Sequence, residues 1–283
     1  MTGRIVVGLD GSANSSAAVR WALREVRLRG ADLEAVTAFG AFAPDGLPDR
    51  DKLRTDKEVA DACARMQREQ LADLPRDGVT VMTSTALGDA AETLVAASAG
   101  ASMLVVGARG RGGVSGLLLG SVSLSCVHLA TCPVTVVPAY VEKPPQGAPV
   151  VVGVKDAARG AAALALGIEE ARLRGTHVVA LHAVHWQPLG TELIRPSTDR
   201  LVEWGTLLLA PVVAAAQGGR PDVFVQQLVV PGHPVEVLDQ QARGADLLVV
   251  GSRRQGRLAG MLLGSVSLHL LTHAHRPITV IVE

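Results

Sequence analysis

Aromatic residues are scarce in this chain: Phe, Trp and Tyr make up 2% of its 283 residues, whereas hydrophobic residues make up 48%. The core must therefore be aliphatic, built mostly from Val, Leu and Ala. Such a core is typical of a parallel sheet that is buried on both faces, because its strands read as continuous apolar runs. The length allows one large domain or two ordinary ones.

An excess of charge of either sign is also absent. Lys+Arg and Asp+Glu both number 27, so the formal net charge is zero and no overall field attracts nucleic acid or an anionic membrane. No apolar run reaches the roughly 18 residues of a membrane-spanning helix. The N-terminus leads straight into a strand and lacks the apolar region of a signal peptide. We expect a cytoplasmic protein with neither nucleic acid nor a membrane as partner.

Cysteines and metal-ligand groupings are sparse. The three cysteines, Cys63, Cys126 and Cys132, have no metal-like spacing, and small buried thiols in a reduced setting explain them most simply. His269 and His273 share a helix face, but no cysteine or carboxylate joins them, so no metal site is expected. No Ser/His/Asp or Cys/His set is placed for nucleophilic catalysis, and we assign no catalytic residue.

What the chain does contain is an internal repeat. Val150–Val154 repeats the pattern of Ile5–Leu9, and Leu262–Leu268 is identical to Leu118–Leu124, 144 residues earlier. A near-constant offset across half the chain indicates two copies of one domain. We place them at residues 1–139 and 149–283, joined by a linker rich in proline and glycine.

Within the first copy, five apolar strands alternate with helices. The third strand is expected at Val79–Thr85, and the fifth at Val134–Val137. This alternation predicts an α/β fold with a doubly wound, five-stranded parallel sheet and right-handed crossovers in each copy.

One stretch of the first copy predicts a phosphate site. An apolar run, Met103–Val106, ends at Gly107, a glycine-rich loop follows, and Gly120-Ser121 opens a helix. Glycines let the backbone approach a ligand, and the free N–H groups at a helix start attract an anion. Ser121 and Ser123 can add hydroxyl donors. The stretch contains neither the lysine of a P-loop nor a Rossmann fingerprint.

The spacing Gly107-x2-Gly110-x9-Gly120-Ser121, followed by Cys132–Val137, closely resembles the ATP-binding signature of the universal stress protein family. The resemblance covers both halves. It implies an adenine nucleotide alpha hydrolase-like sheet of order 3-2-1-4-5 in each half. It also implies that Val134–Val137 pairs with Ile278–Val282, which would make the chain a pseudo-dimer. The implied function is ATP binding with a regulatory role in stress response or dormancy.

The resemblance also implies which residues hold the nucleotide. Gly8, Asp10 and Ala38 would contact adenosine, with the Asp10 carboxylate accepting from the ribose hydroxyls. Mg²⁺ would accompany the phosphates, because the chain offers no cage of its own. Arg109 either contacts the phosphates or is a solvated loop residue. The residues expected to hold phosphate are Gly107, Gly110, Gly120, Ser121, Val122 and Ser123.

The second copy departs from this pattern. Lys155 stands at the position of Asp10, and Arg254 at that of Gly110. Either the second site has lost its nucleotide, or the added cations hold a phosphate at the second helix start. The residues of the pattern that remain are Gly153, Gly251, Gly264, Ser265, Val266 and Ser267.

Two other functions stay open. A weak ATPase or nucleotidyl-transfer enzyme would need a cation near the γ-phosphate, for which only Arg109 or Arg111 is at hand. A nucleotide-free interaction module would use the glycines for helix–sheet packing alone. Further pairing of the two-domain chain into a homodimer, and the identity of a regulatory protein partner, stay open as well.

Overall fold

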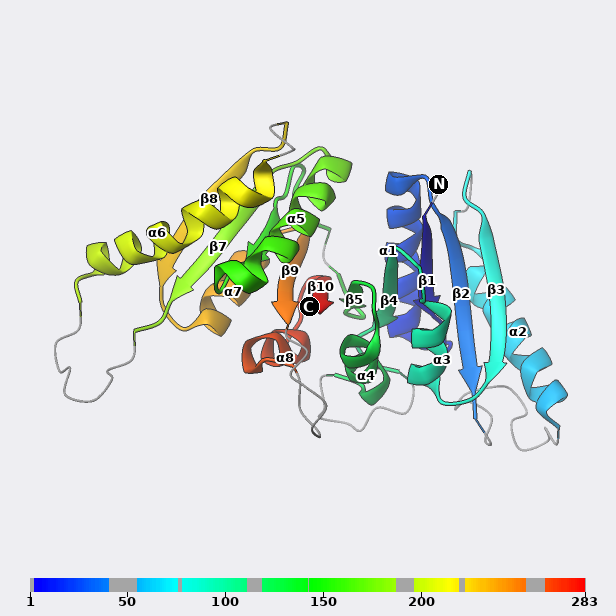
Figure 1. Ribbon diagram of the computed structural model, residues 1–283. Helices are drawn as coiled ribbons and strands as arrows, with labels where there is room; N and C mark the ends of the chain where they lie inside the picture. Colours follow the sequence, from blue (N-terminus) through cyan, green and yellow to red (C-terminus); the bar gives the residue numbers. More distant parts are fainter. Residues whose placement is uncertain are drawn as a thin grey trace. The chain divides into compact units, whose positions relative to one another are not determined.

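The computed structural model describes residues 3–40, 55–75, 78–110, 119–141, 143–186, 196–218, 222–252 and 263–282. Its contacts divide the chain into two compact units, Met1–Val141 and Glu142–Ile281, which we describe separately. Each unit is a parallel sheet with helices on both faces (Figure 1). No helix in these described ranges is long and apolar enough to cross a membrane.

The first unit has the strand order β3-β2-β1-β4-β5, and its paired strands are parallel. This confirms the order 3-2-1-4-5 for this half. Its elements are β1 (Arg4–Gly8), α1 (Ala13–Arg29), β2 (Asp32–Phe39), α2 (Asp56–Ala72), β3 (Val81–Leu87), α3 (Ala90–Ala97), β4 (Met103–Gly107), α4 (Ser121–Leu129) and β5 (Val134–Val137).

The second unit repeats the first with the order β8-β7-β6-β9-β10. The pairing of Val134–Val137 with Ile278–Val282 concerns how the two units are placed, and it stays a prediction. The elements are β6 (Val150–Gly153), α5 (Ala157–Arg174), β7 (Val178–Val184), α6 (Thr198–Gln217), β8 (Val225–Pro231), α7 (Pro234–Ala242), β9 (Leu247–Ser252), α8 (Ser265–Thr272) and β10 (Ile278–Val282).

The central strands form the core, and their side chains are aliphatic. Ile5, Val6 and Val7 of β1 have no exposed surface, and neither do Leu104 and Val105 of β4. Neighbouring residues of a strand point to opposite faces of the sheet, so complete burial of consecutive residues means that both faces are covered. Aliphatic, mostly β-branched side chains suit this setting because they fill both faces without polar atoms that would need partners.

Candidate functional site

The candidate site lies where the order of the strands reverses in the first sheet, between β1 and β4. β1 pairs with β2 on one side and with β4 on the other. The connections after β1 and β4 therefore leave the sheet in opposite directions, which opens a crevice at the carboxyl ends of these strands. Asp10 follows β1, and Arg109 and Gly110 follow β4, so the fold brings these predicted residues to one edge.

Four of the predicted residues, Asp10, Arg109, Gly110 and Gly120, lie close together at this edge. A β-carbon built on Gly110 would lie 2.8 Å from Asp10 Oδ2. A β-carbon on Gly120 would lie 3.5 Å from the Arg109 Cα and 3.6 Å from the Gly110 nitrogen. The Gly120 N–H donates to the Ala108 carbonyl at 2.8 Å, which fixes the start of α4 beside the end of β4. Gly110 thus lies between Asp10, which is predicted to hold adenosine, and Gly120, which is predicted to hold phosphate.

The start of α4 differs electrostatically from the other helix starts of this unit. Ser12 caps α1, Thr55 caps α2 and Asp89 caps α3, each accepting from a backbone N–H of its helix. In the described part of the chain, α4 has no side-chain cap and no acidic residue in its first turn. Its first N–H groups therefore keep the partial positive charge of a helix N-terminus, which favours an anion.

The serines at this helix start have separate roles. Ser121 is exposed and Val122 is half-buried, as a ligand-contacting first turn requires. Ser123 is 3% exposed, and its hydroxyl donates to the Gly107 carbonyl at 2.6 Å. The Ser123 hydroxyl therefore fastens α4 to the end of β4, and a contact of Ser123 with phosphate stays a prediction.

Two of the glycines are explained by packing. A β-carbon on Gly8 would lie 3.0 Å from Leu94 Cδ1 of α3, so this position points into the unit and not toward a ligand. A β-carbon on Gly107 would lie 2.8 Å from the backbone carbon of Asn14, because the first turn of α1 crosses directly over the end of β4. The lack of a side chain at Gly8 thus permits helix–sheet contact, and a contact of Gly8 with adenosine stays a prediction.

A buried relay that the sequence did not reveal holds the Asp10 segment in place. Gln67 Nε2 donates to Thr37 Oγ1 at 2.9 Å, and the Thr37 hydroxyl donates to the Leu9 carbonyl at 2.6 Å. Both side chains are 1% exposed. The sequence feature that could have indicated these hydrogen bonds is Gln67, a glutamine on the apolar face of a helix, four residues after Cys63. The next residue after Thr37 is Ala38, half-buried at the end of β2.

Part of the predicted loop lies outside the described residues. Arg109 is half-buried and Gly110 is exposed, whereas residues 111–118, which include Arg111, are not described. In the second unit, residues 253–262, which include Arg254, are likewise not described.

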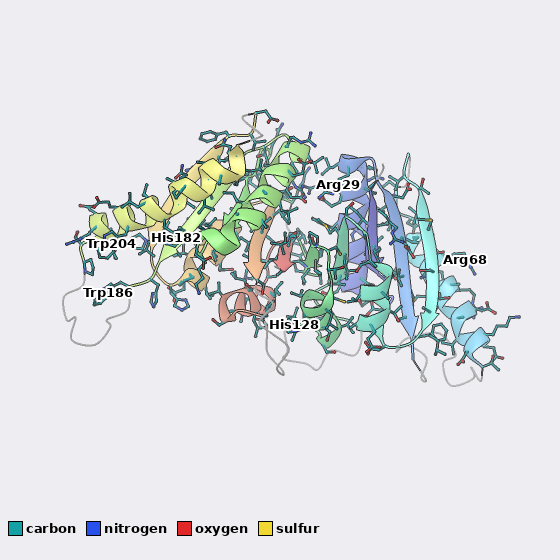
Figure 2. All side chains as sticks on the ribbon, viewed as in Figure 1. Arg29, Arg68, His128, His182, Trp186 and Trp204 are labelled. Carbon is teal, nitrogen blue, oxygen red and sulfur yellow. The ribbon has the colours of Figure 1, made fainter. Side chains whose placement is uncertain are left out.

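The second unit preserves the frame of the site. A β-carbon on Gly153 would lie 3.0 Å from Leu238 Cδ2, as one on Gly8 meets Leu94. His182 Nδ1 lies 2.8 Å from the Val154 carbonyl oxygen, the contact that Thr37 makes with Leu9 in the first unit. His182, which is labelled in Figure 2, is thus the structural counterpart of Thr37.

The charges at this second edge differ from those at the first. Lys155 is exposed where the first unit has Asp10. The N-cap residue of α7 is His233, whose side chain does not cap the helix, whereas Asp89 caps α3. α8 also starts without a side-chain cap, and the residues of its start keep the pattern of α4. Gly264 and Ser265 are exposed, Gly251 and Val266 are half-buried, and Ser267 is 5% exposed.

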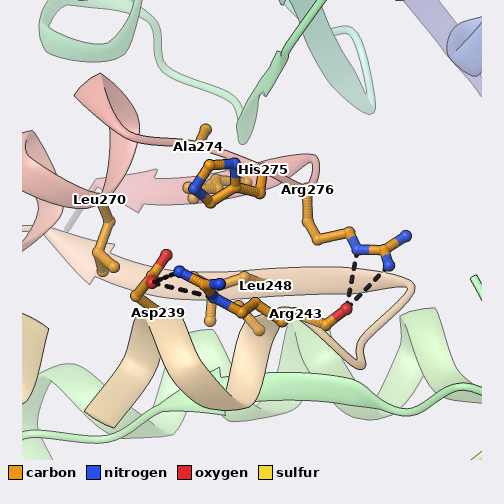
Figure 3. A pocket seen from close by; sticks show the side chains of 9 residues that line it. Asp239, Arg243, Leu248, Leu270, Ala274, His275 and Arg276 are labelled. Carbon is orange, nitrogen blue, oxygen red and sulfur yellow. Dashed lines mark hydrogen bonds and ion pairs between the residues drawn. The ribbon is translucent and has the colours of Figure 1, made fainter. Parts of the chain in front are cut away.

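A small hollow in the second unit lies away from this edge (Figure 3). It is lined by the ends of α7 and α8 and the beginnings of β9 and β10, so it lies at the opposite ends of the strands. Arg276 Nε donates to the Arg243 carbonyl at 3.1 Å, and Arg243 pairs with Asp239 at 3.1 Å. These contacts join the end of α7 to the segment before β10 and are not part of the candidate site.

The fold and the edge define a doubly wound parallel α/β domain, present twice. The model of the universal stress protein family matches residues 1–138 and again 148–282. A universal stress protein of Mycolicibacterium smegmatis is 37% identical, over 98% of this chain and 96% of that protein. Universal stress protein Rv2005c of Mycobacterium tuberculosis is 35% identical with the same coverage. The chain belongs to the universal stress protein family.

Solved structures agree with this fold. A universal stress protein from Archaeoglobus fulgidus superposes with a TM-score of 0.73 at 19% identity, covering 98% of this chain and 97% of that one. A Pseudomonas aeruginosa protein described as a putative universal stress protein gives a TM-score of 0.63 at 15% identity, covering 99% and 93%.

Proposed function

We propose that the first unit binds ATP at the carboxyl ends of β1 and β4. The observation that carries this proposal is the close approach of Asp10 Oδ2 to Gly110, where a β-carbon would lie 2.8 Å away, beside the start of α4, which has no side-chain cap among the described residues. An acceptor for hydroxyl groups and the N–H donors of a helix start are thereby held at one edge. Ribose and phosphate require this combination.

Different residues of the site bind the phosphates, the ribose and the base of the nucleotide. The N–H groups of Ser121 and Val122 receive the phosphates, and the exposed Ser121 hydroxyl adds a donor. The Asp10 carboxylate accepts from the ribose hydroxyls, and Ala38 lies at the β2 end of the same edge, toward the base. In the described ranges no three His, Cys, Asp or Glu side chains gather as a metal site. Mg²⁺ is therefore held mainly by the phosphates.

We further propose that occupancy serves regulation in stress response or dormancy, and that the site does not catalyse fast turnover. A hydrolase needs a base or a positioned cation at the γ-phosphate. At this edge the backbone of Arg109 lies beside the start of α4, with its Cα 3.5 Å from a β-carbon built on Gly120, and Asp10 is assigned to the ribose. Steady-state hydrolysis well above that of the binding-deficient Gly120→Val variant would instead support an enzyme.

The experiment that tests ATP binding uses the whole chain. Small molecules released from freshly purified, denatured protein are identified by mass spectrometry, and thermal unfolding is followed with and without Mg-ATP. A ligand at a hundredfold its Kd stabilises a site by about 2.7 kcal/mol, which is easily measured. No released nucleotide and no shift with ATP would support the nucleotide-free interaction module.

A matched pair of variants separates the two units. Among the described residues, the β-carbon position of Gly120 makes only ordinary contacts and that of Gly264 has no neighbour within 4 Å, so both folds should accept valine. We expect Gly120→Val to abolish the high-affinity site, because the side chain fills the approach to the α4 start. Gly264→Val tests the second site: a fall in stoichiometry from two ATP to one would show that the second unit binds ATP despite Lys155.

A further inference from the structure

The outer face of α6 carries an apolar seam. Its inner face is buried: Leu201, Gly205, Leu209, Val212 and Val213 pack toward the sheet. On the opposite side, five exposed residues lie at intervals of four, three, four and three, namely Arg200, Trp204, Leu207, Pro211 and Ala214. Glu203, Thr206 and Ala215 are exposed beside them. A mean interval of 3.5 residues is the spacing of a helix that packs against another helix along its length.

The exposure of this seam is large for apolar residues. Trp204 is 45% exposed and Leu207 is 68% exposed. Trp204 is labelled on α6 in Figure 2, and the Arg200 guanidinium carbon lies 5.3 Å from the centre of its ring. From residue 204 to the end of α6 no charged residue occurs. A water-exposed helix face without charge over three turns is typical of an interaction surface.

The first unit shows that the fold does not require this apolar face. α2 occupies the same place in its unit as α6, between the second and third strands. Counted from the caps Thr55 and Ser197, Arg65 of α2 corresponds to Leu207 of α6. Apart from Ala72 at its end, the exposed side chains of α2 are charged, among them Asp61, Arg65 and Arg68. Of the two helices, only α6 carries the seam. The fold does not require it, so we look for its role in an interaction.

We propose that α6 pairs antiparallel with α6 of a second copy of this chain, around a two-fold axis at Leu207. The seam is symmetric about this residue to within one position: Leu207 meets its equivalent, Arg200 and Ala214 each lie seven residues away and meet, and Trp204 and Pro211 lie three residues before and four after. Trp204 meets Pro211, so that a large side chain faces a smaller one. A two-fold interface uses one surface patch twice, and a patch that is complementary to itself satisfies this condition.

The charges of α6 favour the antiparallel direction. Asp199, Arg200 and Glu203 all lie in its first two turns. In an antiparallel pair the Arg200 guanidinium reaches the C-terminal end of the other helix, which carries a partial negative charge. In a parallel pair the two Arg200 side chains would lie side by side and repel each other. The seam spans about 21 Å of helix, less than a standard interface covers, so we expect a weak, concentration-dependent dimer.

The first test measures the oligomeric state of the full-length chain by sedimentation velocity across a concentration series. We expect a monomer–dimer equilibrium in the wild type, and a dissociation constant raised at least about tenfold, equivalent to about 1.4 kcal/mol, by Leu207→Glu. Arg65→Glu is the matched control at the corresponding position of α2 and should leave the equilibrium unchanged. Thermal unfolding checks that both variants are folded. A wild type that stays monomeric, or a dimer that Leu207→Glu does not weaken, overturns the proposal.

The second test fixes the direction of the helices with a short bifunctional maleimide. Leu207→Cys should crosslink to a dimer, because the two substituted positions face each other. Arg200→Cys should not, because its two copies lie about 20 Å apart in the antiparallel pair. The wild type, whose Cys63 and Cys126 are buried, gives the background. Crosslinking of Arg200→Cys but not of Leu207→Cys would overturn the proposed arrangement.

Discussion

Asp10 Oδ2 lies 2.8 Å from the point that a β-carbon on Gly110 would occupy. The two residues are a hundred positions apart in the sequence, and the pairing of β1 with β4 brings them together. The second Asp10 oxygen, Oδ1, accepts from the Ser12 N–H at 2.9 Å. One carboxylate oxygen thus orders the start of α1, while the other faces the loop that leads to α4.

Gly110→Ala should weaken ATP binding with little effect on the fold. The new β-carbon would displace the Asp10 carboxylate, and we expect the Kd for ATP to rise at least about tenfold, or about 1.4 kcal/mol. Gly110 is exposed and not in the left-handed backbone region, so stability should change by less than about 1 kcal/mol. Isothermal titration calorimetry measures the affinity. Gly244→Ala, whose β-carbon meets nothing within 4 Å, is the control.

Substitutions of Asp10 should separate stability from binding. Asp10→Asn keeps an oxygen that accepts from the Ser12 N–H, whereas Asp10→Ala removes it and should cost about 1 kcal/mol of unfolding free energy. Both variants lose the charged acceptor for the ribose and should bind ATP more weakly. Urea denaturation and ATP titration of the two variants check this. Wild-type affinity in Asp10→Asn would show that the carboxylate does not hold the ribose.

Arg174 is predicted to stabilise the second unit strongly. Its Nε lies 2.8 Å from Asp246 Oδ2, and it also pairs with Glu170; all three side chains are at most 7% exposed. Arg174→Met leaves two buried carboxylates without this cation and should cost about 3 kcal/mol or more in urea denaturation.

Two control variants accompany Arg174→Met. Arg29→Met breaks the corresponding pair with Glu25 in the first unit, where Ser102 stands in place of Asp246, and it should cost less. Arg172→Met removes an exposed pair with Glu169 and should leave the unfolding midpoint nearly unchanged. Equal losses from all three variants would contradict the role of burial.

The Cys126 thiol should make stability depend on alkaline pH. Burial, followed by the charges of Asp89 and Cys132, raises the pKa of Cys126 from 9.0 to about 12. The folded state therefore keeps a proton that the unfolded chain releases above pH 9. This contribution is complete below pH 9 and is lost as the pH rises toward 12, by up to about 1.4 kcal/mol per pH unit.

The measurement for this thiol is the slope of unfolding free energy against pH between 9 and 11. Cys126→Ala should have a shallower slope than the wild type, whatever its absolute stability. Identical slopes would show that the thiol does not ionise differently in the two states.

The sequence predicted the third strand two residues too early, at Val79–Thr85, whereas β3 is Val81–Leu87. All of Val79–Thr85 favours a strand, so the local pattern could not set the ends. Pairing sets them: Leu33 of β2 lies opposite Val81, and the ladder continues to Phe39 and Leu87. A strand at the edge of a sheet takes its limits from its neighbour.

The repeat, the alternation of strands and helices, and the placing of Asp10, Gly110 and Gly120 at one edge all followed from the sequence. They depend on local pattern and on a general property of parallel sheets, whose strands end at a common edge. Only the tertiary structure decided why particular residues stand there. Gly8 faces Leu94, Gly107 faces Asn14, and the Ser123 hydroxyl reaches the Gly107 carbonyl. Each partner is distant in sequence, and no local periodicity records which distant side chains will meet.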